Sequence, residues 1–306
     1  MRRSFPITAF FALVYFCASV SGAAASGTSG GQILEIHTSA RVLGMGNSGV
    51  ALVNDLNAIV YNPAGLAGIR NTQGQFSHIF YHMGASLNSV MAAGRYRETG
   101  IGLKYKIFYA KDVIRNAAGD ETGEFDIRFH QYSMSAGRSV GLRHSLGATL
   151  NILREEYFSV SGAGFCINLG WRYRLGRNIW YFEPGRESSL GVAIRNLGPG
   201  LFIKGERNVA LPLGISAGGS HVLDNWVVSW EVASGREDSI ALKAGLEYEL
   251  SDFGTELRLR AGANILNSPS LSLGIGVPES SWYLDYAMLL HGGLGSAHRF
   301  TYGINF

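Results

Sequence analysis

Three short motifs in the sequence match patterns that carry chemistry in enzymes. Residues 44–49 (Gly-Met-Gly-Asn-Ser-Gly) have the spacing of a dinucleotide-binding fingerprint, and residues 137–141 and 214–218 have the Gly-x-Ser-x-Gly spacing of a nucleophile elbow. The fingerprint works between a strand and a long helix, and the elbow requires a strand, a sharp turn and a helix. The surrounding residues predict neither arrangement, so chance matches in a glycine-rich chain are the favoured interpretation.

Individual polar residues give equally little support for catalysis or metal binding. A hydrolase could pair Ser216 with His221 or His298, but the sequence suggests no grouping of serine, histidine and acid. His78 and His82 share one face of a predicted strand, without a cluster of further metal ligands nearby. We therefore predict that the protein is not an enzyme and binds no metal or cofactor.

A set of charged residues in the last third of the chain is more informative. Its members alternate with apolar residues, so that the charges share one face of their segments. Opposite charges on adjoining strands can brace a wall and compensate buried charge. The alternative, a polar lining along a substrate path, is less favoured because mixed signs do not select one ion. The set comprises Lys243, Glu247, Glu249, Glu256, Arg258, Arg260, Asp285 and Arg299.

The elements that must position these charges are β-strands with one apolar face. Residues 240–250 alternate apolar and aromatic side chains with small or charged ones, and residues 257–261 and 282–290 repeat the pattern. In a transmembrane barrel one face of each strand meets lipid and the other meets the lumen. Asp285 would be costly against lipid, so its face is assigned to the lumen.

The same alternation predicts about fourteen strands, an even number that lets a barrel close with both termini on one side. Residues 111–124 are expected to form a long outer connection, whereas those near 139–142, 251–253 and 278–280 are short inner ones. Residues 175–187 are too long for an inner connection, which leaves the count open there. The predicted strands are 73–82, 86–96, 100–110, 125–138, 143–154, 159–174, 188–196, 211–221, 225–234, 238–250, 254–265, 269–277, 281–290 and 297–306.

Composition agrees with a membrane barrel. Residues 1–25 read as a secretory signal, whose removal lowers Lys plus Arg from 26 to 24 against 23 Asp plus Glu. The mature net charge is then +1, which gives no case for nucleic-acid binding. Charged residues make up 16%, against about 25% in soluble domains. No later segment has the roughly 18 apolar residues of a spanning helix. Once the predicted signal is removed, Cys166 is the one remaining cysteine and cannot form an intramolecular disulfide.

Residues 26–72, before the first predicted strand, contain two short helix starts. Asn54 and Asp55 can cap a turn over residues 56–60, and Asn62 can cap a turn that begins at Pro63. The order of residues 41–69 resembles the N-terminal segment of FadL-type outer-membrane barrels, especially the PorV/PorQ-like branch. The resemblance implies a plug, or hatch, that folds into the barrel mouth. Its motif residues here are Gly44, Gly46, Asn62, Pro63, Ala64, Gly65 and Leu66.

Further motifs extend the resemblance along the chain. They are residues 195–199 (Arg-Asn-Leu-Gly-Pro), 211–214 (Leu-Pro-Leu-Gly) and 294–299 (Leu-Gly-Ser-Ala-His-Arg). The resemblance implies a β-barrel of residues 73–306 in the bacterial outer membrane. The chain is shorter than long-chain fatty-acid transporters of this type, with modest outer loops.

The end of the chain is similar to the assembly signal of bacterial outer-membrane barrels. Phe300, Tyr302, Ile304 and Phe306 fall on one face of the last predicted strand. An exposed aromatic strand at the edge of a soluble sheet would be an aggregation hazard. We therefore expect this strand to be inserted by the barrel assembly machinery, with its aromatic face toward outer-membrane lipid.

Two functions follow from the resemblance. The first is uptake of long-chain fatty acids or other hydrophobic small molecules, through an apolar pocket under the plug and a gap in the wall. The alternative is a PorV-like scaffold or secretion-system component that binds exported proteins. Neither requires a cofactor or a nucleic acid.

Overall fold

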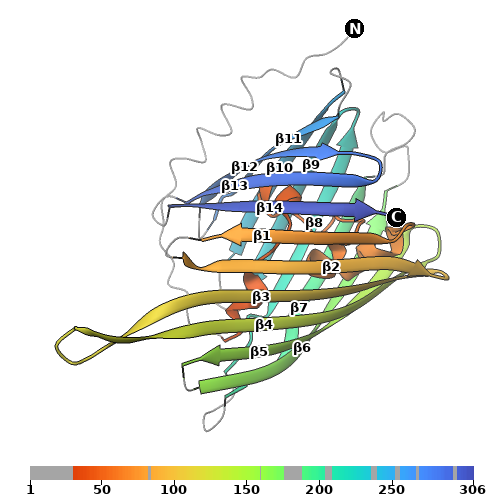
Figure 1. Cartoon of the computed structure of the whole chain (residues 1–306). Helices are drawn as coiled ribbons and strands as arrows, with labels where there is room; N and C mark the ends of the chain where they lie inside the picture. The colour runs from red at the N-terminus through yellow and green to blue at the C-terminus, as the bar shows by residue number, and fades with distance from the viewer. Residues whose placement is uncertain are drawn as a thin grey trace.

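The barrel predicted from the sequence is present in the computed structural model. The structure describes residues 30–81, 84–158, 160–175, 188–203, 209–235, 240–251, 256–266, 269–291 and 295–306. Within these ranges, fourteen antiparallel strands form one closed barrel in which each strand pairs with its sequence neighbours and β1 pairs with β14 (Figure 1). The expected signal at 1–25, His82 and Leu294 lie outside the described residues.

The strands follow the predicted segments closely, with most differences at their ends. No described helix is long and apolar enough to cross a membrane. The strands are β1 Gln73–Phe80, β2 Ser86–Tyr96, β3 Thr99–Arg115, β4 Glu121–Val140, β5 His144–Tyr157, β6 Val160–Arg174, β7 Ser189–Ile203, β8 Gly214–Leu223, β9 Trp226–Gly235, β10 Ile240–Leu250, β11 Leu257–Asn264, β12 Ser270–Pro278, β13 Trp282–His291 and β14 Gly295–Asn305.

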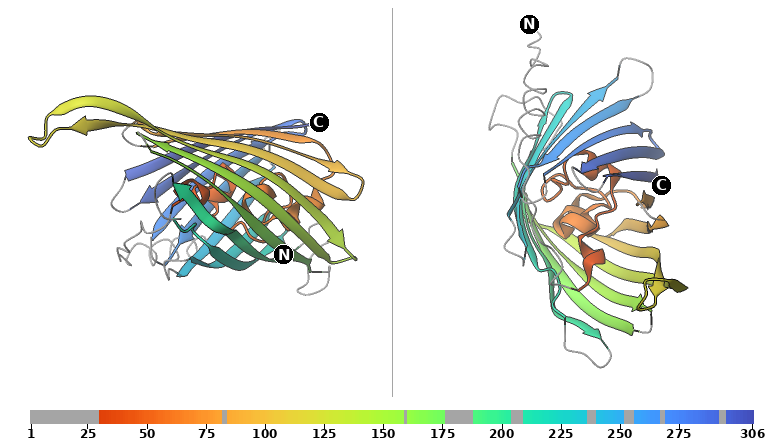
Figure 2. Two further views of the ribbon diagram at one scale, coloured as in Figure 1. Left: turned by 90° about the horizontal axis from the view of Figure 1, so that it is seen from below. Right: turned by 90° about the vertical axis from the view of Figure 1, so that its left-hand side faces the viewer.

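Residues 30–72 lie inside the barrel and are called the inner segment below. They contain two 3-10 turns, η1 (Gln32–Glu35) and η2 (Pro63–Gly68), and two short α-helices, α2 (Ala40–Gly44) and α3 (Ala58–Tyr61). The segment begins near β7, where Gly30 N donates to Ala210 O at 2.9 Å, and ends where Phe306 N donates to Thr72 O at 2.9 Å. Figure 2 shows it enclosed by the wall.

The two ends of the barrel differ in their connections. At one end, called the hairpin end, β3 and β4 continue past the other strands as a long ribbon (Figures 1 and 2). At the other, called the C-terminal end, the chain finishes at Phe306.

The connection predicted at 111–124 is wrong in its length, because β3 runs to Arg115 and β4 starts at Glu121. Ion pairs from Lys111 to Glu124 (3.3 Å) and Arg115 to Glu121 (2.7 Å) link the paired strands.

One seam of the wall is irregular. The register between β6 and β7 shifts on both sides of Ile167. Asn196 has a φ of 61° and Gly200 a φ of 122°, and Pro199 between them has no N–H to donate to a neighbouring strand. These features are typical of β-bulges, which bend a strand and leave a residue unpaired. Because the chain resumes pairing beyond them, β7 extends to Ile203, past the predicted end at residue 196.

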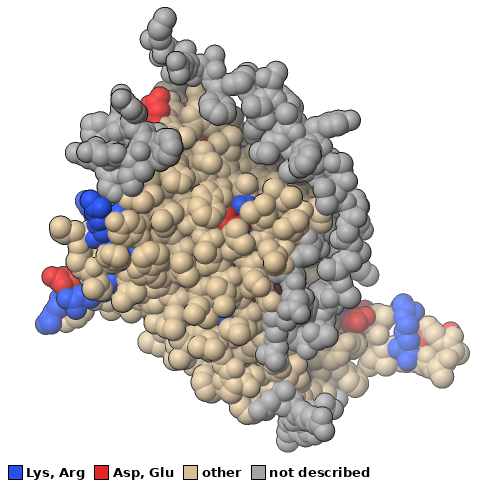
Figure 3. Space-filling model, turned by 180° about the vertical axis from the view of Figure 1, so that it is seen from behind, with Lys and Arg blue, Asp and Glu red and all other residues tan. Residues whose placement is uncertain are grey.

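The outer and inner faces of the wall have opposite chemistry. Leu103, Leu150 and Leu273 point outward and are each at least 40% exposed, whereas Lys104 and Asn151 point inward and are buried. On the face opposite Figure 1, few charged side chains lie on the middle of the wall and more lie toward its ends (Figure 3). This distribution is typical of a barrel with an apolar outer band and a polar interior.

The last strand has the aromatic outer face that the sequence predicts. Phe300 and Tyr302 are 42% and 48% exposed, whereas Thr301 between them is buried. Ile304 on the same face is half-buried, and Phe306 is exposed beyond the strand. Strand β14 pairs with β13 and β1, so it closes the wall.

We expect deletion of Phe306, or the change Tyr302→Asp, to reduce the amount of folded protein in the membrane fraction. A terminal aromatic residue suits the lipid interface, and an aspartate on the same face opposes burial in lipid. Membrane fractionation combined with heat-modifiable gel migration measures both location and folding. Tyr302→Phe, the matched control, should behave as the wild type. Normal levels of heat-modifiable Tyr302→Asp protein would contradict the lipid-facing assignment of this strand.

Candidate functional site

The site begins with the residues that shape the inner segment. Asn62 Oδ1 accepts from Ala64 N at 3.2 Å, and Pro63 is the first residue of η2, which confirms the predicted cap. The amide nitrogen of Asn62 donates to Val50 O at 2.7 Å and to Trp171 O at 3.0 Å. One side chain therefore caps a turn, ties two parts of the segment together and binds the wall.

The other predicted helix start lies two residues later than expected. Helix α3 begins at Ala58, and its N-cap, Asn57, makes no side-chain cap hydrogen bond. Asp55 Oδ1 instead accepts from Asn57 N at 2.9 Å, within the preceding turn. The aspartate thus satisfies a backbone donor just before the helix, which moves the helix start from Leu56 to Ala58.

Seven wall glycines bring the barrel into direct contact with the inner segment. A Cβ atom added to Gly262 would overlap Gly46 N, and one added to Gly170 would overlap Asn62 Oδ1. Substituting either therefore requires the segment or the wall to move. The seven come from β3–β7, β10 and β11, on different sides of the lumen, and are Gly100, Gly137, Gly147, Gly170, Gly191, Gly245 and Gly262.

Wall side chains also satisfy the backbone of the inner segment. Ala40 N donates to Thr301 Oγ1 at 3.1 Å, and Gly46 N donates to Ser272 Oγ at 3.1 Å. Glu231 accepts from Val50 N at 2.9 Å, and Ser189 Oγ donates to Ala51 O at 2.8 Å. Buried backbone groups need such partners because unpaired ones are costly. Sequence reasoning missed Glu231, whose inward position follows from the alternation along β9.

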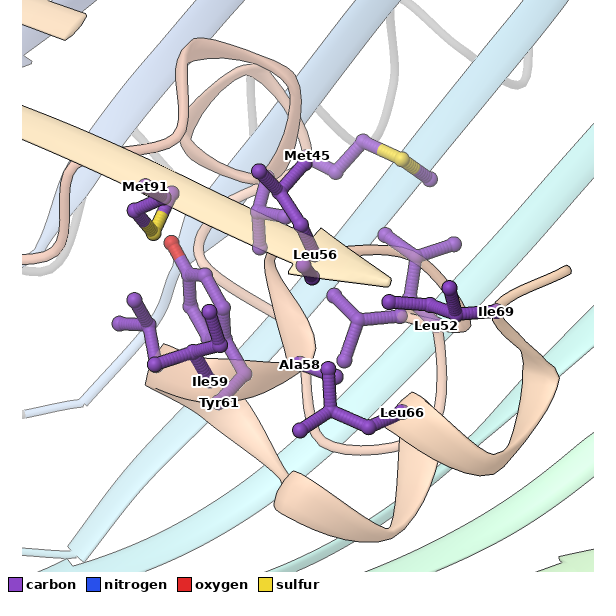
Figure 4. Packing of buried hydrophobic residues seen from close by; sticks show 13 residues of the cluster. Met45, Leu52, Leu56, Ala58, Ile59, Tyr61, Leu66, Ile69 and Met91 are labelled. Atoms are coloured by element: carbon purple, nitrogen blue, oxygen red, sulfur yellow. The ribbon is translucent and has the colours of Figure 1, made fainter. Parts of the chain in front are cut away.

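The folded part of the segment packs around its own apolar core. Leu52, Leu56, Ile59, Tyr61 and Leu66 are buried together, with Met91 of β2 beside them (Figure 4). The segment is thus a packed body rather than an extended strand through the lumen.

A series of ion pairs connects the inner segment to strands β10, β11 and β13 of the wall. Arg41 of the segment donates to Glu247 from Nε and Nη2, each at 3.0 Å, and lies 3.5 Å from Asp55. Arg260 binds Glu247 at 2.6 Å and Asp285 at 2.5 Å. Burial by itself would lower the pKa of Arg41. The charge and hydrogen bonds of Glu247 have the larger effect, so the pKa of Arg41 is raised above its usual value. Arg41 therefore stays charged.

The remaining predicted charges are arranged less tightly. Arg258 lies 3.5 Å from Glu249 and 4.0 Å from Glu256. Lys243 was expected to neighbour charges on β11 but instead pairs with Glu231 of β9 at 3.0 Å. Arg299 Nη1 donates to Ser39 O at 3.5 Å. The structure thus joins Glu247, Arg260 and Asp285 in one network and leaves Lys243 and Arg299 in separate contacts.

At the hairpin end a group of apolar side chains lies in the lumen. Ile33 and Leu34 of the inner segment cluster there with wall residues from seven strands, β1–β7, and with Leu211. We call this set the apolar cluster; its buried wall members are Ile79, Leu87, Leu153, Cys166 and Leu201. Phe108 and Phe129 pack against it from β3 and β4.

A buried lysine holds the segment in the apolar cluster. Lys106 of β3 donates from Nζ to Ile33 O and, at 2.8 Å, to Ile36 O. It is 1% exposed. The ammonium group satisfies carbonyl groups near η1 and fixes Ile33 among the apolar residues.

The C-terminal end of the lumen has a different lining. A cavity of about 660 Å³ lies there between the inner segment and the wall. Its lining includes the hydroxyl-bearing residues Ser139, Ser145 and Ser220 and the carboxylates Glu247 and Glu249. Arginines from the segment and three strands complete its charged lining: Arg41, Arg70, Arg95, Arg172, Arg174 and Arg258.

The motifs that match enzyme signatures do not lie in the strand–turn–helix settings that those signatures require. Residues 44–49 begin at the last residue of the five-residue helix α2, and residues 214–218 lie within β8. Ser216 is buried and its Oγ makes no hydrogen bond, while His298 bonds Tyr286 at 2.8 Å. His78 lies on the outer face of β1 and bonds Asn88 at 2.7 Å. Among the described residues no group of three potential ligands is placed to hold a metal ion.

The barrel fold is shared with solved channel structures. The P. putida toluene transporter TodX is 11% identical, with a TM-score of 0.58 over 87% of this chain and 97% of that chain. A TodX deltaS2S3 mutant, a monoaromatic hydrocarbon channel, is 13% identical, with a TM-score of 0.60 over 82% and 95%. A Pseudomonas aeruginosa FadL homologue is 12% identical, with a TM-score of 0.56 over 88% and 98%. No protein-family model and no curated protein matches the sequence.

We expect Gly262→Ala to destabilise the folded protein because the added methyl group overlaps the inner segment. Overpacking of this kind typically costs about 1–3 kcal/mol. Gly214→Ala is the matched control, since the nearest atom to its added Cβ is 3.7 Å away. The temperature of heat-modifiable migration compares the two variants with the wild type. Equal temperatures for all three proteins would show that the wall tolerates side chains at Gly262.

The Arg41–Glu247 pair should show a coupling free energy of about 1–3 kcal/mol in a double-mutant cycle built from Arg41→Gln and Glu247→Gln. Glu247 is buried, and Arg41 donates to it through two nitrogens. The exposed Arg115–Glu121 pair, cycled in the same way, should give about 0–1 kcal/mol. Unfolding in urea from detergent micelles measures both cycles, and equal coupling energies would contradict a special role for the buried pair.

Proposed function

We propose that this protein is an outer-membrane channel for the uptake of hydrophobic small molecules, including long-chain fatty acids. The observation that carries the proposal is the apolar cluster inside the barrel at the hairpin end. Barrel channels filled with water have polar interiors. An interior lined by Leu87, Leu153 and Leu201 is better matched to an apolar molecule than to a hydrated solute. The shared fold with TodX and a FadL homologue supports the same class of cargo.

An outer-membrane location is part of this proposal. The outward side chains of the wall are largely apolar, and a soluble protein exposing such an area would associate or aggregate. A closed barrel satisfies every strand's hydrogen-bonding groups, which lipid demands. The predicted signal at residues 1–25 supports export to this location.

The inner segment acts in this proposal as a plug. Ile33 and Leu34 occupy the apolar cluster, and Lys106 binds the carbonyl groups of Ile33 and Ile36. A hydrophobic molecule entering from the hairpin end takes the place of these two side chains. The apolar wall residues that contact Ile33 and Leu34 in the plugged barrel then contact the ligand. The wall glycines hold the rest of the segment in position.

Deleting the gene should lower cellular uptake of radiolabelled oleate, and restoring the wild-type gene should recover it. Leu153→Gln should restore uptake poorly, because a buried amide without a partner costs about 1–3 kcal/mol. Ser135→Ala, at a polar lumen position outside the apolar cluster, is the control and should restore uptake. Membrane levels of both variants must match. Unchanged oleate uptake after gene deletion would contradict the proposal.

The β3–β4 ribbon favours a second candidate, a PorV-like scaffold that binds exported proteins. The ribbon extends past the barrel and carries exposed charges such as Lys111 and Glu124. Affinity purification from detergent-solubilised outer membrane, with and without residues 110–127, tests this candidate. Stoichiometric protein partners that disappear with the shortened ribbon, together with normal oleate uptake, would favour the scaffold over the channel.

A further inference from the structure

The cavity at the C-terminal end concentrates positive charge inside the barrel. Among the residues that the structure describes, its lining contains six arginines and two carboxylates. Those carboxylates already have arginine partners, since Glu247 binds Arg41 at 3.0 Å and Glu249 lies 3.5 Å from Arg258. Among the described residues of the lining, Arg70 and Arg95 form no ion pair with either carboxylate.

Arg70 and Arg95 bring positive charge to the cavity. Arg95 of β2 donates to two neutral backbone oxygens, Arg97 O at 2.9 Å and Ile69 O at 3.4 Å. Arg70 directly follows Ile69 at the end of the packed part of the inner segment and is exposed to the cavity. Carbonyl oxygens orient a guanidinium group but do not cancel its charge.

Two more arginines approach from another strand. Arg172 and Arg174 of β6 both line the cavity, and Arg172 Nη2 donates to Ser189 Oγ at 3.2 Å. Cations from β2, β6 and the inner segment therefore converge on one space. The surrounding wall excludes part of the solvent, and a cleft in which positive charges outnumber negative ones raises the local concentration of anions.

We propose that this cavity is a binding site for an anionic group, a carboxylate or a phosphate. The guanidinium fork matches both groups in a bidentate geometry. Ser139, Ser145 and Ser220 add hydroxyl donors to the same lining. Because the site faces the lumen and not the outer wall, its ligand is a free anion or the anionic head of an amphipathic molecule inside the barrel. The site is independent of the transport proposed above, since it shares no residue with the apolar cluster.

Calorimetric titration of the full-length protein in a neutral detergent tests the site with two probes, inorganic pyrophosphate and octanoate. Arg70→Gln combined with Arg95→Gln should weaken binding by about tenfold or more, since charge-assisted hydrogen bonds to the anion are lost. Added NaCl should weaken wild-type binding, because salt screens exposed charges. Octanoate that competes with pyrophosphate identifies an amphipathic head group as the ligand, whereas binding of pyrophosphate alone identifies a free anion.

The matched control is Arg97→Gln combined with Arg138→Gln. Both residues are exposed at the same end of the barrel but do not line the cavity. This control removes the same charge and should bind within about twofold of the wild type. Heat-modifiable migration verifies that each variant is folded. Absence of binding by the wild type, or equal loss of affinity in the two double variants, overturns the proposal.

Discussion

Direct contact between the wall glycines and the backbone of the inner segment is the constraint on which the structure depends. Seven strands carry a glycine where the segment passes, and a methyl group at any of these positions would overlap the segment. Small residues elsewhere allow similarly close approach, as at Ser229, whose Oγ lies 2.5 Å from Ser48 Oγ. The packed body therefore has one position in the barrel. The caps, the buried ion pairs and the wall side chains that bind its backbone all require that position.

The inner segment divides one lumen into two environments. At the hairpin end Ile33 and Leu34 lie among apolar side chains, whereas at the C-terminal end arginines and serines line a cavity. Between these ends, Glu247 joins Arg41 of the segment to Arg260 of the wall. Burying such charges is tolerable only when each has partners with good geometry. The segment is thus held to the wall by electrostatic contacts and, at the hairpin end, by apolar contacts.

The strand pattern was predictable because one face of each strand must be apolar and the other need not be. That rule fails at residues 111–124, where the ribbon leaves the wall and neither face must be apolar, and at the bulge near Asn196. Asn62 was predictable as a cap because capping is local. The partner of Lys243 was not, since it depends on the register between β10 and β9, which places Glu231 opposite Lys243. The wall glycines could have been found by noting that glycine recurs at inward positions of successive strands.

The close contacts at the wall glycines oppose entry of the inner segment into a finished barrel. Helix α2 contacts β11–β14, while η2 contacts β3–β6, so the segment touches strands from both halves of the chain. An open sheet presents no such obstacle. The pairing of β1 with β14 joins the strands most distant in sequence, and its loop-closure entropy is the largest of any pairing. The inner segment contacts strands of both halves of the chain. Contacts of this kind lower the loop-closure entropy that the pairing of β1 with β14 must overcome.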